Sequence, residues 1–353
     1  MTTLIIFLII LSIVVLIHEL GHFLMAKKVG VRVEEFGLGY PPRAIGKKIG
    51  ETIYSLNWLP FGGFVRLYGE MEEGSETTKS KRAFYNRSKK EKGLVILAGV
   101  FMNLMLAIAC FSLIYSIKGI PEEVNYVMVD GIAPNSPAEE AGIQIGDRII
   151  AIDGVEIERV DKFVEYLKDK QGKEVLFEFK QGDSLAKKIL IPRLDPPQGE
   201  GAIGVAVSNY DNVFYPIWQM PFRGAWVGIQ EAFAWTKLMF GGLGQMIGDS
   251  FSGKAPEVSG VVGIYQATGT VAEMGFLALV KFVGILSINL AVVNILPFPA
   301  LDGGRFLFLL LEKAMGKKMK PIIEAKINMI GMMILIGLMV AVTVLDVRRL
   351  IIK

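Results

Sequence analysis

A long apolar run near the N-terminus ends in two histidines and a glutamate, and this combination limits the folds that are open to the chain. The run covers residues 4–17 (LIIFLIILSIVVLI) and leads directly into HELGH at 18–22. Ionisable side chains are costly inside a bilayer and are tolerated there where they face a protein interior and have partners. The pentapeptide therefore predicts a functional polar site inside a bundle of membrane helices.

Four stretches of the chain are candidate membrane spans, since a helix needs about 20 apolar residues to cross the hydrocarbon of a bilayer. They are residues 4–26, 94–117, 276–296 and 327–345. A signal peptide is the competing interpretation of residues 1–17. Their start, MTT, carries no basic side chain and no small-residue cleavage site follows, so we expect a retained first helix.

The composition agrees with membrane spans that carry a folded aqueous part. Of the 353 residues, 52% are hydrophobic, yet 21% are charged, which is too many for a chain embedded only in lipid. The net charge of +3 is small and the basic residues are not interleaved with aromatic ones, so no nucleic-acid partner is expected. The single cysteine, Cys110, excludes a disulfide within the chain.

The distribution of Lys and Arg predicts the orientation of the spans, because cytoplasmic loops are enriched in them. Residues 27–92 hold 14 Lys and Arg against 8 Asp and Glu, whereas residues 118–215 hold 11 against 18. We expect the loops 27–92 and 312–320 to be cytoplasmic, and both termini and the acidic segment to be extracytoplasmic.

The apolar segment 221–247 needs a separate decision. Trp226, Phe233 and Phe240 recur every seven residues, and polar residues recur at the same spacing on another face. A helix with this pattern is amphipathic and has aromatic anchors, which favours a position in the membrane interface. A span here would instead move the later motifs to the opposite side of the membrane.

HELGH has the spacing of a metal site. His18 and His22 are one helical turn apart and project from one face, while Glu19 is rotated by about 100° and can act on a water molecule without being a ligand. Zinc is the expected metal, because two imidazoles and a carboxylate leave a fourth tetrahedral position for water. Two structural histidines hydrogen-bonded in a helix bundle are the alternative.

The third ligand must be another residue type, because the chain has only two histidines. The candidate is Asp302 in NILPFPALDGGR, residues 294–305, where two prolines break the helix and two glycines let the backbone approach another group closely. This motif and HELGH both lie at cytoplasmic ends of spans in the predicted orientation, so the three side chains can share one depth. A plain turn role is the alternative for Asp302.

Residues 129–157 (VDGIAPNSPAEEAGIQIGDRIIAIDGVEI) have the pattern strand, turn, short helix, turn, strand, turn, and EVLFEFK at 174–180 alternates as a half-buried strand. This pattern resembles bacterial PDZ domains and extends from about 124 to 195. Its groove would take an extended peptide as an added strand, or the domain would be a rigid plug without a peptide ligand.

Taken in order, HELGH, GVFMN at 99–103, the PDZ-like insert and NILPFPALDGGR resemble the site-2 protease family of intramembrane metalloproteases, of the bacterial regulator-of-sigma-E protease type. The resemblance implies that His18, His22 and Asp302 bind zinc. It also implies that Glu19 is the general base and that Asn294 holds the substrate backbone. Val100 and Val262 stand where the family pattern has proline, which affects local backbone shape and leaves the ligand set unchanged.

The resemblance also places a membrane-reentrant β-hairpin in residues 31–69, where glycines interrupt β-favouring runs. An edge strand near Gly62 and Gly63 could pair with an unwound substrate segment and replace the hydrogen bonds that the segment loses. A tight turn is the alternative role for these glycines.

The expected fold class is a polytopic α-helical membrane protein with four transmembrane helices, a membrane-reentrant β-hairpin region and an extracytoplasmic PDZ (α+β) domain. The expected division has four parts: the first two helices with HELGH and the cytoplasmic loop, the PDZ domain, an interfacial amphipathic segment, and the last two helices with LDGG. These parts are residues 1–117, 118–210, 211–270 and 271–353.

The expected function is that of a zinc-dependent intramembrane endopeptidase in the bacterial cytoplasmic (inner) membrane. By resemblance, its substrates are single-pass membrane proteins already cut by a site-1 protease, including anti-sigma factors and signal-peptide remnants. The alternatives are a membrane-anchored PDZ scaffold without proteolytic activity and a metal transporter. The presence of Glu19 with all three ligands argues against the scaffold, and the few polar residues per span argue against the transporter.

Overall fold

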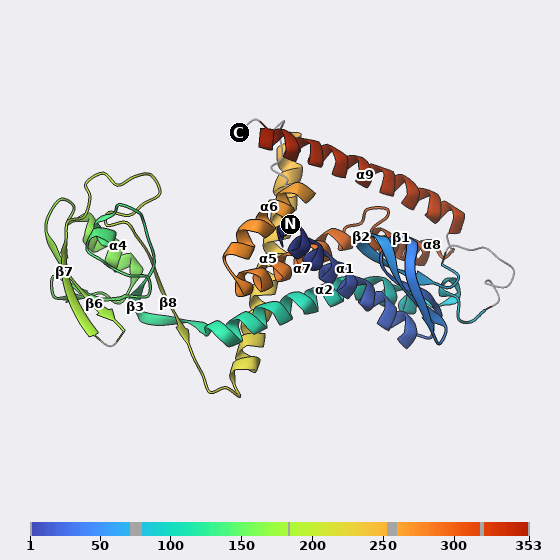
Figure 1. Cartoon of the computed structure of the whole chain (residues 1–353), viewed down its shortest axis with the longest axis horizontal. Helices are drawn as coiled ribbons and strands as arrows, with labels where there is room; N and C mark the ends of the chain where they lie inside the picture. The colour runs from blue at the N-terminus through green and yellow to red at the C-terminus, as the bar shows by residue number, and fades with distance from the viewer. Residues whose placement is uncertain (1, 71–79, 183, 253–259, 318–320, 352–353) are drawn as a thin grey trace. The chain divides into compact units, whose positions relative to one another are not determined.

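The computed structural model describes residues 2–70, 80–182, 184–252, 260–317 and 321–351 (Figure 1). It consists of two compact units. The first contains Met1–Ile114 together with Pro221–Lys353, and the second is Tyr115–Met220.

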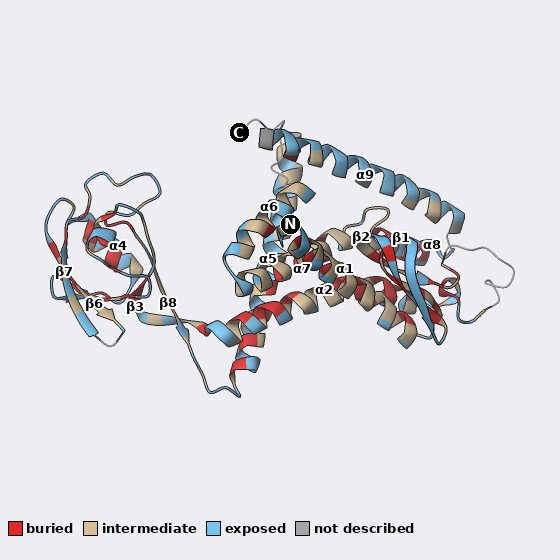
Figure 2. Ribbon diagram, in the orientation of Figure 1, coloured by how far each residue is buried: buried red, intermediate tan, exposed pale blue. Residues whose placement is uncertain are grey.

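Four helices of the described chain are long and apolar enough to cross a bilayer, which confirms the four predicted spans. They are α1 (Thr2–Lys28), α2 (Lys89–Lys118), α7 (Phe276–Ile295) and α9 (Pro321–Ile351). Figure 2 shows that α9 is exposed along most of its length, and its exposed side chains are mainly Met, Ile, Leu and Val. Lipid is the solvent that suits such a surface.

Small residues determine how closely the spans pack. A Cβ atom at Gly21 of α1 would lie 2.3 Å from the carbonyl oxygen of Ala98 on α2. A Cβ at Gly284 of α7 would lie 3.0 Å from the ring of Phe111 on α2, which is fully buried. Close backbone approach of this kind is how membrane helices gain packing energy where the surrounding lipid is as apolar as the side chains.

The loop after α1 folds into a bent hairpin of β1 (Val33–Ile49) and β2 (Thr52–Leu67). Because both strands bend, the first half of β1 pairs with two parts of β2: Gly37, for example, pairs with both Ser55 and Phe64. Within the described chain, residues 63–67 form one edge of this sheet. The predicted hairpin is present, and its insertion into the membrane stays a prediction.

The remaining elements of the first unit are short or amphipathic. They are the 3-10 helix η1 (Phe84–Asn86) and the helices α5 (Met220–Phe251), α6 (Val261–Glu273) and α8 (Asp302–Met315). The helix predicted at 221–247 is α5, and its position in the membrane interface stays a prediction.

The expectation of a loop at 312–320 is wrong for its first part. Residues up to Met315 continue α8, because the apolar run after Asp302 packs with helical spacing. Gly316 ends the helix with a φ of +67°, a left-handed conformation that glycine adopts without strain. Residues 318–320 lie outside the described residues.

The second unit is an α+β domain, as predicted. Its elements are β3 (Ile120–Ile132), α3 (Pro137–Glu140), β4 (Arg148–Ile152), β5 (Val155–Glu156), α4 (Val160–Lys168), β6 (Val175–Gln181), β7 (Ser184–Leu190) and β8 (Val205–Val213). The sheet order is β7-β6-β4-β3-β8, and β5 pairs with β4. Its core gathers Phe163 and Leu167 of α4 with Phe177 and Phe179 of β6.

The domain continues beyond residue 195, where the PDZ-like pattern of the sequence was expected to end, because β8 pairs with β3 along most of its length. A Pro- and Gly-rich stretch separates β8 from β7, and β8 itself, VAVSNYDNV, lacks a clear alternation of apolar and polar residues. Neither feature marks a strand that belongs to the preceding sheet.

The turn between β4 and β5 is fixed by Asp153 and Gly154, which have φ angles of +50° and +78°. Two positive φ values suit the right-handed twist of a short hairpin. The Asp153 carboxylate accepts hydrogen bonds from the Leu176 backbone N–H at 2.9 Å, from Lys170 Nζ at 2.9 Å and from the Tyr166 hydroxyl at 3.2 Å. The Leu176 and Lys170 contacts lower the pKa of Asp153 below its ordinary value.

Replacing Asp153 with asparagine, which tolerates the left-handed conformation, should weaken this unit at neutral pH and remove part of its acid sensitivity. Because the pKa of Asp153 is lowered on folding, its ionised form stabilises the unit above the ordinary pKa of 3.8, and this contribution is lost as pH falls through the lowered folded value. Hydrogen exchange of residues 115–220 in the intact protein, at about pH 7 and about pH 3, measures both effects. The control is Asp195→Ala, which changes an exposed carboxylate of the same unit. Equal protection in the wild type and Asp153→Asn at both pH values would contradict the prediction.

Candidate metal centre

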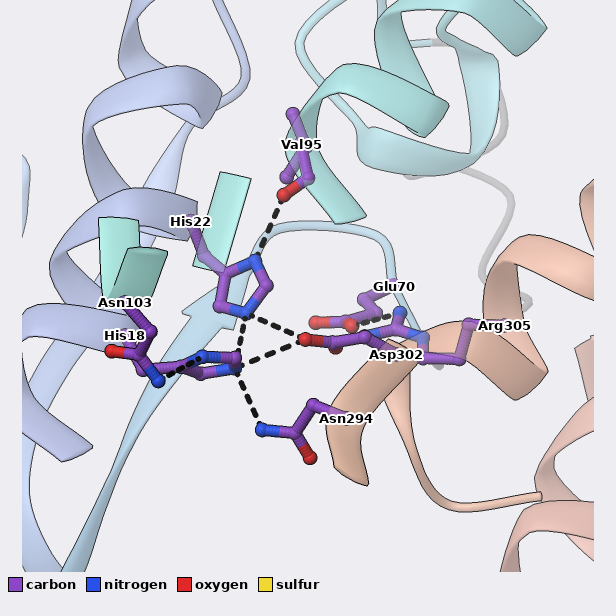
Figure 3. A network of polar contacts seen from close by, with 8 residues as sticks. All are labelled: His18, His22, Glu70, Val95, Asn103, Asn294, Asp302 and Arg305. Atoms are coloured by element: carbon purple, nitrogen blue, oxygen red, sulfur yellow. Dashed lines mark hydrogen bonds and ion pairs between the residues drawn. The ribbon is translucent and has the colours of Figure 1, made fainter. Parts of the chain in front are cut away.

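Three side chains from the two ends of the chain meet in the first unit (Figure 3). His18 and His22 project from α1, and Asp302 lies at the first residue of α8. Asp302 Oδ2 is 3.0 Å from His18 Nε2 and 3.2 Å from His22 Nε2, and the two Nε2 atoms are 3.2 Å apart. All three side chains are at least 86% buried, so the cluster is largely shielded from bulk solvent.

This geometry fits a zinc ion. Ligand atoms about 2.0–2.1 Å from a tetrahedral zinc are about 3.3 Å apart, and the three observed separations are close to this value. Imidazole nitrogen and carboxylate oxygen are also donor types that zinc takes. The structure therefore brings together the three residues that the sequence predicted as ligands, and their role as ligands stays a prediction.

The helix α2 forms one wall of the cluster. His22 Nδ1 donates to the backbone carbonyl of Val95 at 2.8 Å, which leaves its Nε2 lone pair directed at the cluster. A Cβ atom at Gly99, one turn further along α2, would lie 2.4 Å from His22 Nε2 and 2.7 Å from His18 Nε2. Only glycine at this position leaves room for both imidazoles.

Steric constraints also explain the two glycines that follow Asp302. Cβ atoms there would lie 2.1 Å from the Ile295 carbonyl oxygen at Gly303 and 2.2 Å from the Phe298 carbonyl oxygen at Gly304. The first turn of α8 therefore packs directly against the backbone that leaves α7, as the sequence motif indicated. This packing fixes the position of Asp302 at the start of α8.

The loop before Asp302 is held by the last span. Ala300 has a φ of +75°, and its backbone N–H donates to Asn328 Oδ1 of α9 at 3.1 Å. A Cβ at Gly331, one turn further along α9, would lie 2.5 Å from Pro299. The strained backbone of this loop is thus supported by direct contact with α9.

The other predicted site residues lie around the same cluster. Asn294 Nδ2 is 3.3 Å from His18 Nε2. Glu19 directly follows His18 on α1. A Cβ at Gly63 would lie 3.3 Å from Glu19 Cγ, so the edge segment of β2 begins beside the predicted base. Together with the cluster, these residues come from α1, β2, α7 and α8.

The backbone conformation of Gly62 is that of a residue in a turn, which was the alternative role of the glycine pair. Its φ is +77°, and a Cβ there would lie 2.8 Å from the ring of Tyr40. Glycine is therefore required at these two neighbouring positions for different reasons. Gly63 lies close to Glu19, and Gly62 allows the chain to turn.

An ion pair beside the cluster was not predicted from the sequence. Arg305 of α8 pairs with Glu70, which follows the hairpin (Figure 3). The Arg305 guanidinium also lies 5.8 Å from the centre of the Phe84 ring. Arg305 is part of the DGGR motif, but nothing in the sequence indicates a partner 235 residues away. The pair joins the end of the hairpin to the helix that carries Asp302.

Comparison with known proteins places the chain in a family. The family model described as Peptidase family M50 matches residues 6–338. A protein of Clostridium perfringens named as a zinc metalloprotease is 36% identical over 338 residues, which cover 95% of this chain and 96% of that protein. The regulator of sigma-W protease RasP of Bacillus subtilis is 29% identical over 425 aligned residues, which cover 99% of each protein.

Part of the chain is also similar to the crystal structure of the PDZ domain of an SdrC-like protein from Listeria monocytogenes. The match is 25% identical and covers 24% of this chain and 87% of that domain, with a TM-score of 0.22. The family match spans most of the chain and agrees with the site-2 protease resemblance of its motifs. The chain therefore belongs to peptidase family M50 and is a multi-pass membrane zinc metalloprotease.

Proposed function

We propose that this metalloprotease is an intramembrane endopeptidase that hydrolyses peptide bonds within transmembrane segments of single-pass membrane proteins. The observation that carries the proposal is the position of the candidate ligands. His18 and His22 lie on a helix able to span the bilayer, and Asp302 lies seven residues beyond the end of another. A cluster on such helices is suited to substrates that share the membrane with it.

The side chains around the cluster have complementary roles in hydrolysis. Zinc, when bound, supplies a Lewis acid that makes water more acidic and takes up charge on the scissile carbonyl. Glu19 accepts a proton from the attacking water and delivers it to the leaving amine nitrogen. The Asn294 amide donates to the substrate backbone and holds the scissile bond beside His18, to which it is already close.

The hairpin presents the substrate to this site. A peptide bond in a transmembrane helix is hydrogen-bonded and shielded, so the segment must unwind before hydrolysis, and its freed backbone groups need new partners. The edge segment 63–67 can supply them by pairing with the extended substrate. The position of Gly63 supports this assignment, because a Cβ atom there would lie 3.3 Å from Glu19 Cγ, so the start of the edge is next to the predicted base.

The PDZ-like unit screens substrates in this proposal. A cavity of about 250 Å³ lies between α4 and the start of β8 and is lined mainly by apolar side chains, including Phe163, Leu167, Ile203 and Val205. A groove between a helix and a strand can bind an extended peptide as an added strand, which favours a binding role over a plug. Its ligand would be the end of a membrane protein trimmed by a site-1 protease.

The proposed location is the bacterial cytoplasmic membrane, with the hairpin loop in the cytoplasm and the PDZ-like unit outside. The relative named regulator of sigma-W protease supports anti-sigma factors as one substrate class. Remnants of signal peptides, which are single membrane spans, form a second class of the same chemistry.

Replacing Asp302 with alanine should remove one of three ligands and strongly reduce zinc binding. The detergent-purified wild type should contain about one zinc per chain by elemental analysis, and Asp302→Ala much less. The matched control is Asp346→Ala, because Asp346 is also a buried carboxylate but accepts from the Gly260 backbone N–H, outside the cluster. Equal zinc in the wild type and Asp302→Ala would show that the ligand set is wrong.

Replacing Glu19 with glutamine should abolish cleavage and leave the zinc content unchanged. Glutamine keeps the size of the side chain but cannot accept the proton of water, so the expected loss is about 10²–10⁴-fold or more. Cleavage of a single-span substrate in detergent and zinc content are measured on the same preparation. A variant that cleaves at the wild-type rate would contradict the role of Glu19, and a scaffold or transporter would keep its function.

Replacing Gly63 with valine should slow cleavage without removing zinc. The new side chain would press against Glu19 Cγ and the Gly37 carbonyl oxygen, 3.3 Å and 3.1 Å from its Cβ. Small displacements at a catalytic centre can cost about 10²-fold in rate. Lys47→Ala, an exposed change in the same sheet, is the control and should keep the wild-type rate. A normal rate for Gly63→Val would indicate that the edge does not present substrate.

A further inference from the structure

We propose that Asn103 is a positioning residue of the metal centre, accepting a hydrogen bond from His18 Nδ1 so that His18 Nε2 is available to the metal. This inference rests on the proposed zinc site and extends it to α2. The hydrogen bond of the Asn103 side chain in the described chain is to His18 Nδ1, which is not one of the three candidate ligand atoms, so its effect is exerted through the imidazole of His18.

The residues that contact the two imidazoles form a stripe along α2. Val95, Gly99 and Asn103 are four residues apart and lie on one face of the helix. Val95 accepts from His22 Nδ1, Gly99 leaves space for both rings, and the Asn103 amide lies 3.3 Å from His18 Nδ1. One face of α2 thus provides a separate contact for each imidazole.

Asn103 is deeply buried and held in place. Its exposed fraction is zero, as is that of Ser287 on α7, whose hydroxyl donates to the Asn103 backbone carbonyl at 2.8 Å. Asn103 Oδ1 is buried and has no hydrogen-bond partner among the residues that the structure describes. A buried amide with an unused acceptor is costly, so a donor for this oxygen is to be expected nearby.

The His18 ring supplies that donor when its proton is on Nδ1. A neutral imidazole carries one proton, and a ring that binds a metal through Nε2 must carry it on Nδ1. The amide lies with Nδ2 toward Nδ1, and a half-turn of the amide plane exchanges its two atoms within the same volume. Either orientation makes one hydrogen bond, but only Oδ1 facing Nδ1–H is compatible with a metal on Nε2.

Such contacts behind a ligand are typical of metal sites. A histidine ligand usually donates its second ring N–H to a carboxylate or carbonyl, and loss of the acceptor commonly costs 10–100-fold in metal affinity. Val95 fills this role for His22 with its backbone carbonyl. Asn103 fills it for His18, where the acceptor is a side chain and can be changed by mutation.

The test is the zinc affinity of the detergent-purified full chain, measured by competition with a chelator. Asn103→Leu keeps the size of the side chain but removes the acceptor, and its zinc affinity should fall by about 10–100-fold. Asn103→Asp keeps an acceptor and should bind zinc about as tightly as the wild type. Thr268→Val removes a fully buried hydroxyl of α6 and should leave zinc affinity unchanged.

A purely structural role for Asn103 is distinguished by thermal unfolding of the zinc-free protein. Leucine suits a buried position, so zinc-free Asn103→Leu should unfold at or above the wild-type temperature, while the stabilisation by added zinc shrinks. Wild-type zinc affinity in Asn103→Leu, or equal losses in the Leu and Asp variants, would overturn the inference. A wild type that binds no zinc would instead overturn the proposed function on which it rests.

Discussion

The structure depends on one constraint: two imidazoles and a carboxylate placed among membrane helices need partners for every polar atom. His18, on the first span, and Asp302, beyond the third, are separated by 284 positions and meet at 3.0 Å. A group of this kind is unfavourable in hydrocarbon unless protein surrounds it. The bundle therefore has to bring both ends of the chain to one place, and a metal held there would bind them together.

The backbone around the cluster meets this requirement mainly through missing side chains. Gly99 leaves space for the imidazoles, and Gly303 and Gly304 let the start of α8 lie against the carbonyls that follow α7. Asn328 then supports the loop between these two helices. Because interiors are close-packed, a single methyl group at any of the three glycines would displace a ligand or the backbone that carries it. Geometry at the centre is thus determined by residues that have no chemistry of their own.

Much of this arrangement could be predicted from local patterns. Apolar length gave the four spans, and the spacing of HELGH and the prolines and glycines around Asp302 indicated which side chains would gather. The contacts of Asn103, Arg305 and Asn328 could not be predicted, because each joins two segments that are separate in the sequence, and the apolar periodicity of a segment does not indicate its partner. The end of α8 was missed for a related reason: lysines near Gly316 suggested a loop, whereas packing of the preceding apolar residues continues the helix.

The second unit enters and leaves through neighbouring points. Ser116 Oγ donates to the carbonyl oxygen of Met220 at 3.3 Å, and the first residue of β3 pairs with the last of β8. A domain whose two ends lie close together can be inserted between two helices of another domain. Its folding then puts little strain on the chain that continues on either side. In evolutionary terms, such an insertion can be exchanged, duplicated or shortened while the helices on either side keep their register. The second unit can thus diversify between related proteins without altering the candidate zinc ligands, which lie in the first unit.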